Sequence, residues 1–436
     1  TTRTHPSLTH PGILFSRMES GRARPMQAVD FEGCSPAHDV GTGAARGHAI
    51  EIDKTPKRCY TIKGVTFEVD LRYRIEKRLG AGSFGTVVRA LDQEKGEPVA
   101  IKRISKAFED IRACKKALRE IKMMRHFQHE NILGLRDIML PSNKGWHDLY
   151  LVVDLMDTDL HYIIHSKQAL SYGHVQWLFY QLMRGLKAIH SASAIHRDLK
   201  PSNLLVNASS DLKICDFGLA RAVVEQEMNH ALTEYVVTRW YRAPELIAHT
   251  ADYGQAVDLW SAGCILAECL GRRVLLQGQD YLHQMRLILD LLGTPNESEL
   301  TALGNETAAD YVRRLPRRDG TLLASLYPSA PPTALDLLSA LLAFDPRRRI
   351  RASDALTHAY LCELNEMNEA PDASPLGGSG ALTFEQRQDL DEHDLRALVW
   401  NELREFHPEA SLVPPAANNS PARIMDIDLT CHEGTL

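Results

Sequence analysis

The segment at residues 196–203, His-Arg-Asp-Leu-Lys-Pro-Ser-Asn, constrains this chain more than any other feature. Asp-Phe-Gly follows at residues 216–218, and Ala-Pro-Glu follows at residues 243–245. Taken alone, each carboxylate in these motifs would be interpreted as an ordinary solvated surface group. That interpretation explains poorly why the motifs occur together, in this order and at these spacings. They therefore indicate a site that carries out chemistry.

A second pattern, at residues 80–85, has the spacing Gly-x-Gly-x-x-Gly. In a dinucleotide-binding fold a helix follows the last glycine. Here the β-branched run at residues 86–88 follows instead, and the sequence has no Gly-Lys-Ser/Thr of a Walker A loop. The pattern favours a hairpin whose glycines let backbone N–H groups approach phosphates.

Lys102 ends the apolar strand sequence Val-Ala-Ile-Lys, shortly after the glycine motif. A single lysine is usually only a solvated surface residue. Its position in a strand after a glycine loop nevertheless favours phosphate binding. Such a lysine needs a carboxylate to hold it, and Glu120 on the next predicted helix is well placed.

The hydrophobic pattern changes from strands to helices along the chain. Strands are predicted at residues 86–90, 99–104 and 149–154, with a helix at about 111–125 between them. After residue 154, apolar residues follow helical spacing, as at Val175, Leu178, Leu182, Leu186 and Ile189. A strand-rich unit followed by a helix-rich unit predicts an α+β protein with two lobes and a cleft between them.

The two ends of the chain have a different composition. Residues 1–72 are predicted to be a flexible extension, because most of them are small, polar or basic and show no sustained period. A linker is predicted at residues 370–381, and residues 413–436 are predicted to be a flexible tail. The chain starts with Thr1, and Met18 and Met26 are both candidate starts of translation.

Composition narrows the setting in which the protein works. The net charge of −6 gives no overall attraction to nucleic acid, so no direct nucleic-acid binding is expected. No window has the roughly 18 consecutive apolar residues of a membrane helix, so no membrane partner is expected. The 8 cysteines form no Cys-x-x-Cys pair, which favours free thiols in a reducing compartment.

In this order the motifs resemble those of the eukaryotic protein kinases, over about residues 73–361. The resemblance implies a bilobal kinase fold, with a small lobe at 73–154 and a large lobe at 155–361. It also implies ATP and Mg²⁺ as cofactors. It gives His196 a structural role, in which the imidazole packs with Phe217, Met124 and Asp258.

The same resemblance assigns the catalytic roles. Asp198 is expected to accept the proton of the substrate hydroxyl, and Lys200 is expected to stabilise charge on the transferred phosphoryl group. Asn203 and Asp216 are expected to hold Mg²⁺, which prefers oxygen ligands. Lys102, held by Glu120, is expected to bind the α- and β-phosphates.

Further residues resemble the nucleotide-binding positions of the family. Val87, Ala100 and Leu205 would enclose adenine, and Val153 would be the gatekeeper. Asp154 and Met156 would bind adenine through the backbone, and Asp159 would meet the ribose. The glycines Gly80, Gly82 and Gly85 and the ammonium of Lys102 complete the set.

Thr233-Glu234-Tyr235 lies between Asp-Phe-Gly and Ala-Pro-Glu. Together with the sequence that follows it, this tripeptide resembles the extracellular-signal-regulated branch of the mitogen-activated protein kinases. The resemblance implies phosphorylation of Thr233 and Tyr235, and each phosphate attracts arginines. The expected partners are Arg119, Arg197 and Arg221 for phospho-Thr233, and Arg239 and Arg242 for phospho-Tyr235. Lys116 stands where the family usually has another arginine, so that contact is expected to be weaker.

The region at residues 362–412 resembles the docking patch, linker and C-terminal extension of the family. Its late helix carries an apolar stripe that is expected to pack on the small lobe, formed by Leu395, Leu398, Val399, Leu403 and Phe406. Glu363, Glu366 and Glu369 lie where an acidic docking patch is expected. A solvated acidic helix end explains these three glutamates equally well. Glu245 is expected to pair with Arg349.

The leading interpretation is a Ser/Thr kinase that phosphorylates Ser/Thr-Pro sites in a mitogen-activated protein kinase cascade. Its expected partners are an upstream dual-specificity kinase, protein substrates with basic docking segments, and phosphatases. The expected location is the cytoplasm, with the nucleus as a second site. A cyclin-dependent-type kinase and a pseudokinase scaffold are the alternatives. Loss of Lys102, Asp198, Asn203 or Asp216 would indicate the scaffold, and all four are present.

Overall fold

The computed structural model describes residues 57–82, 85–141, 146–222, 238–250, 253–367, 372–376, 382–385, 387, 389–408 and 410. The chain divides into two compact units. One unit contains Lys115–Arg136 and Val153–Gln388 and is mostly helical, whereas the other is rich in strands. This division into a β-rich and a helical part confirms the predicted α+β class.

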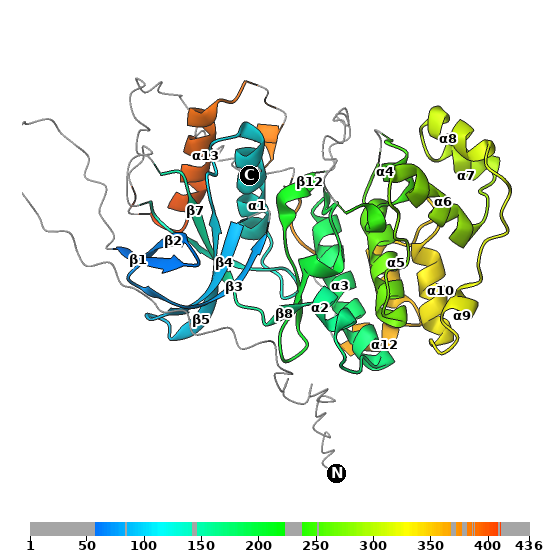
Figure 1. The fold of residues 1–436 in the computed structure, drawn as a ribbon, viewed down its shortest axis with the longest axis horizontal. Coiled ribbons are helices and arrows are strands. Elements are labelled where there is room, and N and C mark those ends of the chain that lie inside the picture. Colours follow the sequence, from blue (N-terminus) through cyan, green and yellow to red (C-terminus); the bar gives the residue numbers. More distant parts are fainter. Residues whose placement is uncertain are drawn as a thin grey trace, which may run out of the picture. The chain divides into compact units, whose positions relative to one another are not determined.

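A five-stranded sheet in the order β3-β4-β5-β7-β6 forms most of the β-rich unit (Figure 1). Its strands are β3 (Tyr73–Gly82), β4 (Gly85–Asp92), β5 (Glu97–Ile104), β6 (Leu135–Ile138) and β7 (Leu149–Asp154). The three strands predicted from the sequence correspond to β4, β5 and β7, so these predictions are confirmed. The predicted helix between them is also confirmed, as α1 (Ile111–His126).

A separate hairpin corrects the prediction that residues 1–72 are a flexible extension. β1 (Lys57–Ile62) pairs antiparallel with β2 (Val65–Asp70), and Phe67 and Val69 are fully buried. Lys63 and Gly64 both have positive φ, as the turn of a two-residue hairpin requires. The prediction was wrong for residues 57–70, because a Lys-Gly turn between two alternating apolar runs was overlooked. Residues 1–56 lie outside the described residues.

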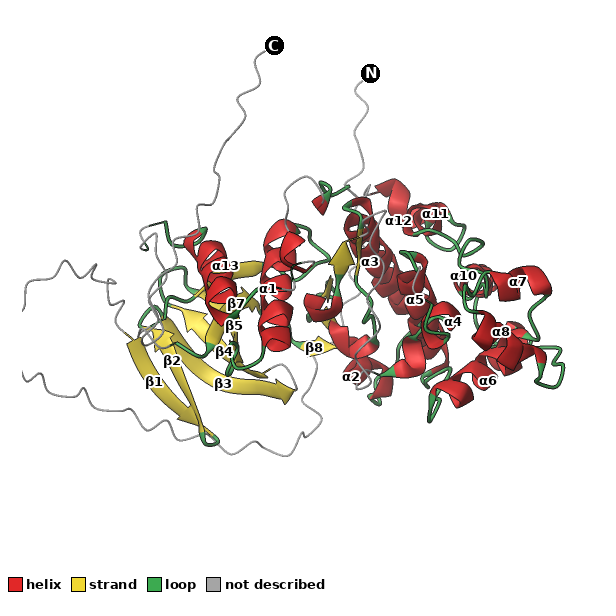
Figure 2. Ribbon diagram, turned by 90° about the horizontal axis from the view of Figure 1, so that it is seen from above, coloured by secondary structure: helices red, strands yellow, loops and turns green. Residues whose placement is uncertain are grey.

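The predicted late helix is present in the β-rich unit as α13 (Glu392–Arg404). Figures 1 and 2 both show it beside β7. Leu395, Val399 and Leu403 are fully buried, as the apolar stripe predicted. Leu398 is partly exposed, and Phe406 lies beyond the end of the helix.

Arg396 fixes α13 to the rest of this unit. Its guanidinium lies 4.1 Å from the ring centroid of Phe108 and donates a hydrogen bond to the carbonyl oxygen of Trp146. On its own helix it pairs with Glu392 at 2.8 Å. Beyond the helix, Nε2 of His407 lies 2.8 Å from Oδ1 of Asp137. The extension is therefore held by charged groups as well as by its apolar stripe.

Besides most of α1, the helical unit contains a series of long and short helices from residue 160 onward. They are α2 (Leu160–His165), α3 (Tyr172–Ser191), α4 (Pro244–Ile247), α5 (Ala256–Gly271), α6 (Tyr281–Leu292), α7 (Glu297–Thr301), α8 (Glu306–Arg313), α9 (Leu323–Leu326), α10 (Pro332–Leu341), α11 (Ala352–Thr357) and α12 (Cys362–Met367). Short strands join them, namely β8 (Thr158–Asp159), β9 (Ala194–Ile195), β10 (Leu204–Val206), β11 (Leu212–Ile214) and β12 (Arg221–Ala222). Single helical turns occur at η1 (Pro201–Asn203), η2 (Phe217–Leu219), η3 (Arg239–Tyr241) and η5 (Thr383–Glu385). None of the helices in these described segments is both long and apolar enough to cross a membrane.

Helix α5 is the centre of this unit. Every residue from 257 to 269 is buried, which is expected of a helix that is apolar on all sides. Figure 2 shows α3 alongside α5, and the two helices are in contact. α10 packs closely on the other side, because a methyl group at Gly263 would lie only 3.0 Å from Cβ of Leu341. Asp258 and Glu268 are the two charged residues within this buried stretch.

Part of the predicted linker at residues 370–381 lies against α3. The N–H of Leu376 donates to the carbonyl oxygen of Ala192 at 3.0 Å, and the Leu376 side chain is buried. The N–H of Ala373 donates to Oγ of Ser191 at 2.9 Å. These contacts hold the described part of the linker, residues 372–376, on the helical unit.

Arg396→Ala is expected to lower the free energy of unfolding by about 2 kcal/mol, because it removes a buried charged hydrogen bond and a cation–π contact. Arg286→Ala is the control, since Arg286 is exposed on α6, and its effect should stay within about 0.5 kcal/mol. Chemical unfolding followed by circular dichroism measures both. Equal effects of the two substitutions would show that Arg396 does not hold the extension.

Candidate active site

The hairpin of β10 and β11 brings the two acidic motifs together. These strands are antiparallel, with Leu204 opposite Ile214, so the residues flanking them become neighbours. The N–H of Cys215 donates to the carbonyl oxygen of Asn203 at 3.0 Å. Asn203 precedes β10 and Asp216 follows β11, so both residues lie at the same end of the hairpin. The predicted metal-binding pair, Asn203 and Asp216, is thus placed at one end of one hairpin.

Asp198 lies at the centre of a short polar network. Nζ of Lys200 donates to its Oδ2 at 2.7 Å, and Nδ2 of Asn203 donates to its carbonyl oxygen at 2.8 Å and to Oδ2 at 3.1 Å. The Asp198 side chain is 6% exposed. A small cavity beside it is lined by Arg197, Thr238, Tyr241 and others. Asp198, predicted to accept the substrate proton, is therefore in direct contact with Lys200, predicted to stabilise the phosphoryl group, and with Asn203, predicted to hold Mg²⁺.

His196 has contacts at both ring nitrogens. Nδ1 accepts the N–H of Asp198 at 3.3 Å, and Nε2 lies 3.0 Å from the carbonyl oxygen of Cys215. The imidazole is fully buried, and its ring centroid lies 5.1 Å from that of Phe217. These contacts assign the Nε2–H tautomer and leave no lone pair for a substrate proton. They agree with the structural role that the resemblance gave to His196.

Asp258 on α5 holds the backbone of the catalytic segment. Its Oδ2 accepts the N–H of His196 and its Oδ1 accepts the N–H of Arg197, both at 2.8 Å. Nε2 of His190 lies 2.9 Å from the same carboxylate. Burial alone would raise the pKa of Asp258, but these hydrogen bonds and the two imidazoles outweigh it and lower the pKa. The carboxylate is therefore kept ionised inside the protein.

Asp216 adopts a backbone conformation that is uncommon for residues other than glycine. It lies in the left-handed region at φ 66°, and its Oδ1 accepts the N–H of Gly218 at 3.4 Å. A methyl group at Gly218 would collide with the side chain of Lys116 on α1. Helix α1 therefore lies close to the glycine of Asp-Phe-Gly.

The arginines predicted to bind phospho-Thr233 gather around another carboxylate. Nε and Nη2 of Arg119 donate to the two oxygens of Glu385 at 2.6 and 2.9 Å, and Nη1 of Arg221 lies 3.9 Å from Glu385. Arg119 also donates to the carbonyl oxygen of Gly218. Burial, together with the charges of Arg119 and Arg197, lowers the pKa of Arg221 to about 10. The three arginines thus form one basic cluster, and Glu385 of η5 is its counter-ion.

Arg239 and Arg242, the predicted partners of phospho-Tyr235, share one tyrosine. Their guanidinium carbons lie 5.5 and 5.8 Å from the ring centroid of Tyr281. Nη1 of Arg242 also donates to the Tyr281 hydroxyl at 2.6 Å. Both guanidinium groups are therefore held against the first residue of α6. Thr233 and Tyr235 themselves lie outside the described residues.

In the β-rich unit the predicted phosphate-binding residues lie on three neighbouring strands. Gly80 and Gly82 end β3 and Gly85 begins β4, with Gly82 opposite Gly85 in the predicted hairpin. A side chain at Gly85, where φ is 122°, would collide with the carbonyl oxygen of Arg103. Lys102 lies opposite Val87, and Ala100 is two residues before Lys102. These three side chains therefore share one face of the sheet.

The other predicted nucleotide-binding residues lie in the helical unit, as does Glu120, which is buried on α1. Val153 is buried, and Leu205 pairs with Asp159 between β10 and β8. Oδ1 of Asp159 accepts the N–H of Tyr162 at 2.8 Å and so caps α2. The Asp154 carboxylate is held by Arg136 at 2.7 Å, and the intermediate exposure of Met156 leaves it accessible. The roles of these residues at the nucleotide stay predictions.

Two other sequence predictions can be placed. Glu245 and Arg349 form the expected ion pair at 2.8 Å, and both side chains are buried, so this prediction is confirmed. Glu363 and Glu366 are exposed on α12, as either a docking patch or a solvated helix end requires. Glu369 lies outside the described residues.

Sequence reasoning overlooked three residues that the structure brings to this site. They are Glu385, His190 and Tyr281. Each is far along the chain from the residue it contacts: Glu385 is 266 residues from Arg119, His190 is 68 from Asp258, and Tyr281 is 39 from Arg242. No local pattern in the sequence indicates such contacts.

Comparison with known proteins identifies the family of the chain. Residues 73–361 match the protein kinase domain. The chain is 44% identical over 362 residues to mitogen-activated protein kinase 7 of Arabidopsis thaliana, covering 83% of this chain and 96% of that protein. It is 48% identical over 351 residues to mitogen-activated protein kinase 3 of the same plant, covering 80% and 93%. Extracellular signal-regulated kinase 1 of Dictyostelium discoideum is 46% identical over 356 residues, covering 81% and 66%.

Asp258→Asn is expected to lower stability most at neutral pH. A carboxylate whose pKa is lowered by folding contributes stability above its unfolded pKa, which is about 3.9, and loses it as the pH falls through the lower folded value. The difference in unfolding free energy between wild type and variant should therefore be largest at neutral pH and shrink in acid. Chemical unfolding at several pH values measures it, and a difference independent of pH would contradict this account.

Proposed function

Because the chain belongs to the mitogen-activated protein kinases and is a serine/threonine protein kinase, we propose that it transfers the γ-phosphate of ATP to serine or threonine followed by proline. The observation that carries this proposal is the direct contact of Asp198 with Lys200 and Asn203. Phosphoryl transfer depends mainly on positioning and on charge stabilisation, and this network supplies both.

The residues present suit the magnesium ion that protein kinases generally use. Nδ2 of Asn203 is engaged by Asp198, which leaves its Oδ1 as a donor atom. One carboxylate oxygen of Asp216, Oδ1, accepts the N–H of Gly218. Hard oxygen donors of this kind suit Mg²⁺, which when bound neutralises charge on the phosphates. Asn203 and Asp216 would hold the ion, and Lys102 with Glu120 would bind the α- and β-phosphates.

The substrate hydroxyl would be oriented by the Asp198 carboxylate, which accepts its proton as the new bond forms. The ammonium of Lys200, 2.7 Å from that carboxylate, would stabilise negative charge on the phosphoryl group. Asp258 would act at a distance from the reaction, by holding the backbone on both sides of His196.

Activation is proposed to follow phosphorylation of Thr233 and Tyr235 by an upstream dual-specificity kinase. Glu385 supports this proposal, because it neutralises the cluster of Arg119 and Arg221 in the unmodified chain. A phosphate carries nearly two charges and three acceptor oxygens, so it would compete effectively for the same arginines. Phospho-Thr233 would therefore displace Glu385, whereas Arg239 and Arg242 would receive phospho-Tyr235.

Partners follow from the cascade in which such kinases act. Besides the upstream kinase, the proposal includes phosphatases and protein substrates with basic docking segments. Glu363 and Glu366, exposed on α12, would attract those segments by charge. The proposed location is the cytoplasm, with the nucleus as a second site. Among the described residues, Cys114, Cys264, Cys269 and Cys362 carry free thiols, as a reducing compartment allows.

Asp198→Asn tests the catalytic proposal. The dually phosphorylated protein should phosphorylate a Ser-Pro peptide with ATP and Mg²⁺, and the variant should lose about 10²- to 10⁴-fold in kcat because the proton acceptor is gone. A peptide with Ala in place of Pro is the specificity control, and thermal unfolding checks that the variant is folded. Turnover by the wild type no higher than by the variant would refute catalysis by this site.

Glu385→Gln tests the proposed exchange of counter-ions. In the unphosphorylated chain the substitution should lower the free energy of unfolding by about 2 kcal/mol, because Arg119 loses one acceptor and the other is no longer charged. After phosphorylation of Thr233 the loss should be smaller, since the phosphate supplies the charge. Unfolding of both proteins in both states measures this.

The matched control is Asp372→Asn, which removes the ion pair between the exposed carboxylate of Asp372 and Lys187. Its effect should stay below about 1 kcal/mol and should not depend on phosphorylation. If Glu385→Gln behaves in the same way in both states, Glu385 and the phosphate do not share the arginines.

A further inference from the structure

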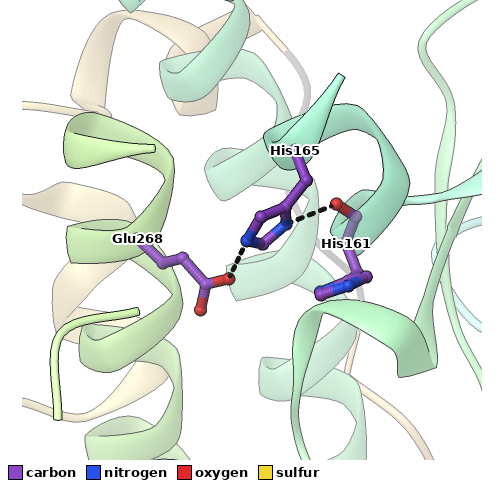
Figure 3. A group of neighbouring side chains, drawn as sticks. All are labelled: His161, His165 and Glu268. Atoms are coloured by element: carbon purple, nitrogen blue, oxygen red, sulfur yellow. Dashed lines mark hydrogen bonds and ion pairs between the residues drawn. The ribbon is translucent and has the colours of Figure 1, made fainter. Parts of the chain in front are cut away.

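Two histidines of α2 face the buried end of α5. His161 and His165 are four residues apart and so lie on the same side of the helix, and Glu268 of α5 points toward them (Figure 3). One ligand atom from each of the three residues lies within 4.8 Å of the others. All three residues belong to the helical unit, and none has a role in the proposed phosphoryl transfer.

The Glu268 carboxylate is only half satisfied. Its Oε2 accepts the hydroxyl of Tyr241 at 2.7 Å, whereas its Oε1 is buried and accepts no hydrogen bond. The side chain is 0% exposed. Nε2 of His165 lies 4.0 Å from Oε1, which is too long for a hydrogen bond. A buried carboxylate oxygen without a donor is costly, and this one points toward the two imidazoles.

His165 is also oriented for a ligand. Its Nδ1 lies 2.9 Å from the carbonyl oxygen of His161, so Nδ1 carries the proton in the neutral ring. The lone pair is then on Nε2, the atom that faces Glu268, as the dashed lines in Figure 3 show. A backbone carbonyl that fixes the tautomer in this way is typical of histidines that bind metals. Tyr241 orients the carboxylate in the same manner.

We propose that His161, His165 and Glu268 form a binding site for Zn²⁺, with a fourth position open to water. Two imidazoles and one carboxylate are a ligand set that zinc accepts. Magnesium and calcium need more oxygen ligands than this site offers. The cation would give the unpartnered Oε1 the positive charge that it lacks.

The distances permit binding after a small movement. Zinc bonds of about 2.0 Å place tetrahedral ligand atoms roughly 3.3 Å apart. Oε1 and Nε2 are now 4.0 Å apart, so His165 must move inward by less than one ångström. His161 and His165 are exposed and free to adjust, whereas Glu268 is fixed by burial and by Tyr241. Tyr241 also lines the cavity beside Asp198, so the metal would lie one side chain from that cavity.

Zinc titration of the full chain, after treatment with a chelator, tests the proposal. Isothermal calorimetry with zinc sulfate should show a site in the wild type that weakens at least about 10-fold in His161→Gln and in His165→Gln. The control is His147→Gln, which removes an exposed histidine of the β-rich unit. This control should bind zinc as the wild type does. Equal affinity in all four proteins would overturn the proposal, because zinc would then be bound elsewhere.

Thermal unfolding gives an independent readout. A metal that binds the folded chain raises Tm as its concentration rises. Zinc should therefore raise Tm in the wild type and in His147→Gln, but not in His165→Gln. Glu268→Gln keeps the shape of the side chain and should also abolish the rise. No rise in the wild type would mean that Glu268 and His165 form only a loose ion pair.

Neither measurement depends on catalysis, so the zinc site and the proposed kinase activity can fail separately. Replacing zinc with cobalt reports the coordination geometry of the bound metal ion. Its visible absorption should be that of a tetrahedral ion in the wild type and should be lost in His165→Gln. A six-coordinate spectrum unchanged by this substitution would also overturn the proposal.

Discussion

The candidate active-site segment at residues 196–203 depends on Asp258, a carboxylate on the buried helix α5. Burying a charge costs several kcal/mol unless it is paired and hydrogen-bonded. Here the cost is offset by the N–H groups of His196 and Arg197 and by the imidazole of His190. Arg197 also has φ 69°, a strained conformation that persists only when its surroundings fix it. The same helix thus forms the core of the unit and shapes the catalytic segment.

Other segments of the site are attached to α5 as well. Glu268, near the opposite end of the helix, accepts the hydroxyl of Tyr241, which comes shortly before Ala-Pro-Glu. At the start of the helix, Arg349 joins Glu245 of that motif to the carbonyl oxygen of Ala256. The catalytic segment and the segment around Ala-Pro-Glu are therefore positioned by one buried element. Glu268 differs from the other anchors, because only one of its oxygens is satisfied.

Local patterns were sufficient for most elements of the fold. Strands β4, β5 and β7 were predicted from runs rich in β-forming residues, and helix α1 was predicted from apolar residues near one face. The β1–β2 hairpin carries the same kind of signal, but it adjoins a long stretch without periodicity and was interpreted as part of it. Asp198, Asn203 and Asp216 could be identified because they belong to short motifs at fixed spacing.

The sequence by itself indicated the chemistry of this protein, because Asp198, Lys200 and Asn203 belong to one short motif and the order of the motifs is distinctive. It also determined which arginines are candidates for binding phosphate. Only the tertiary structure decided which carboxylate neutralises these arginines and which one holds the backbone of the motif at residues 196–203. Glu385 reaches Arg119 across 266 residues, and Asp258 reaches His196 across 62. Contacts at such separations depend on how whole helices pack, and no local pattern of residues records that packing.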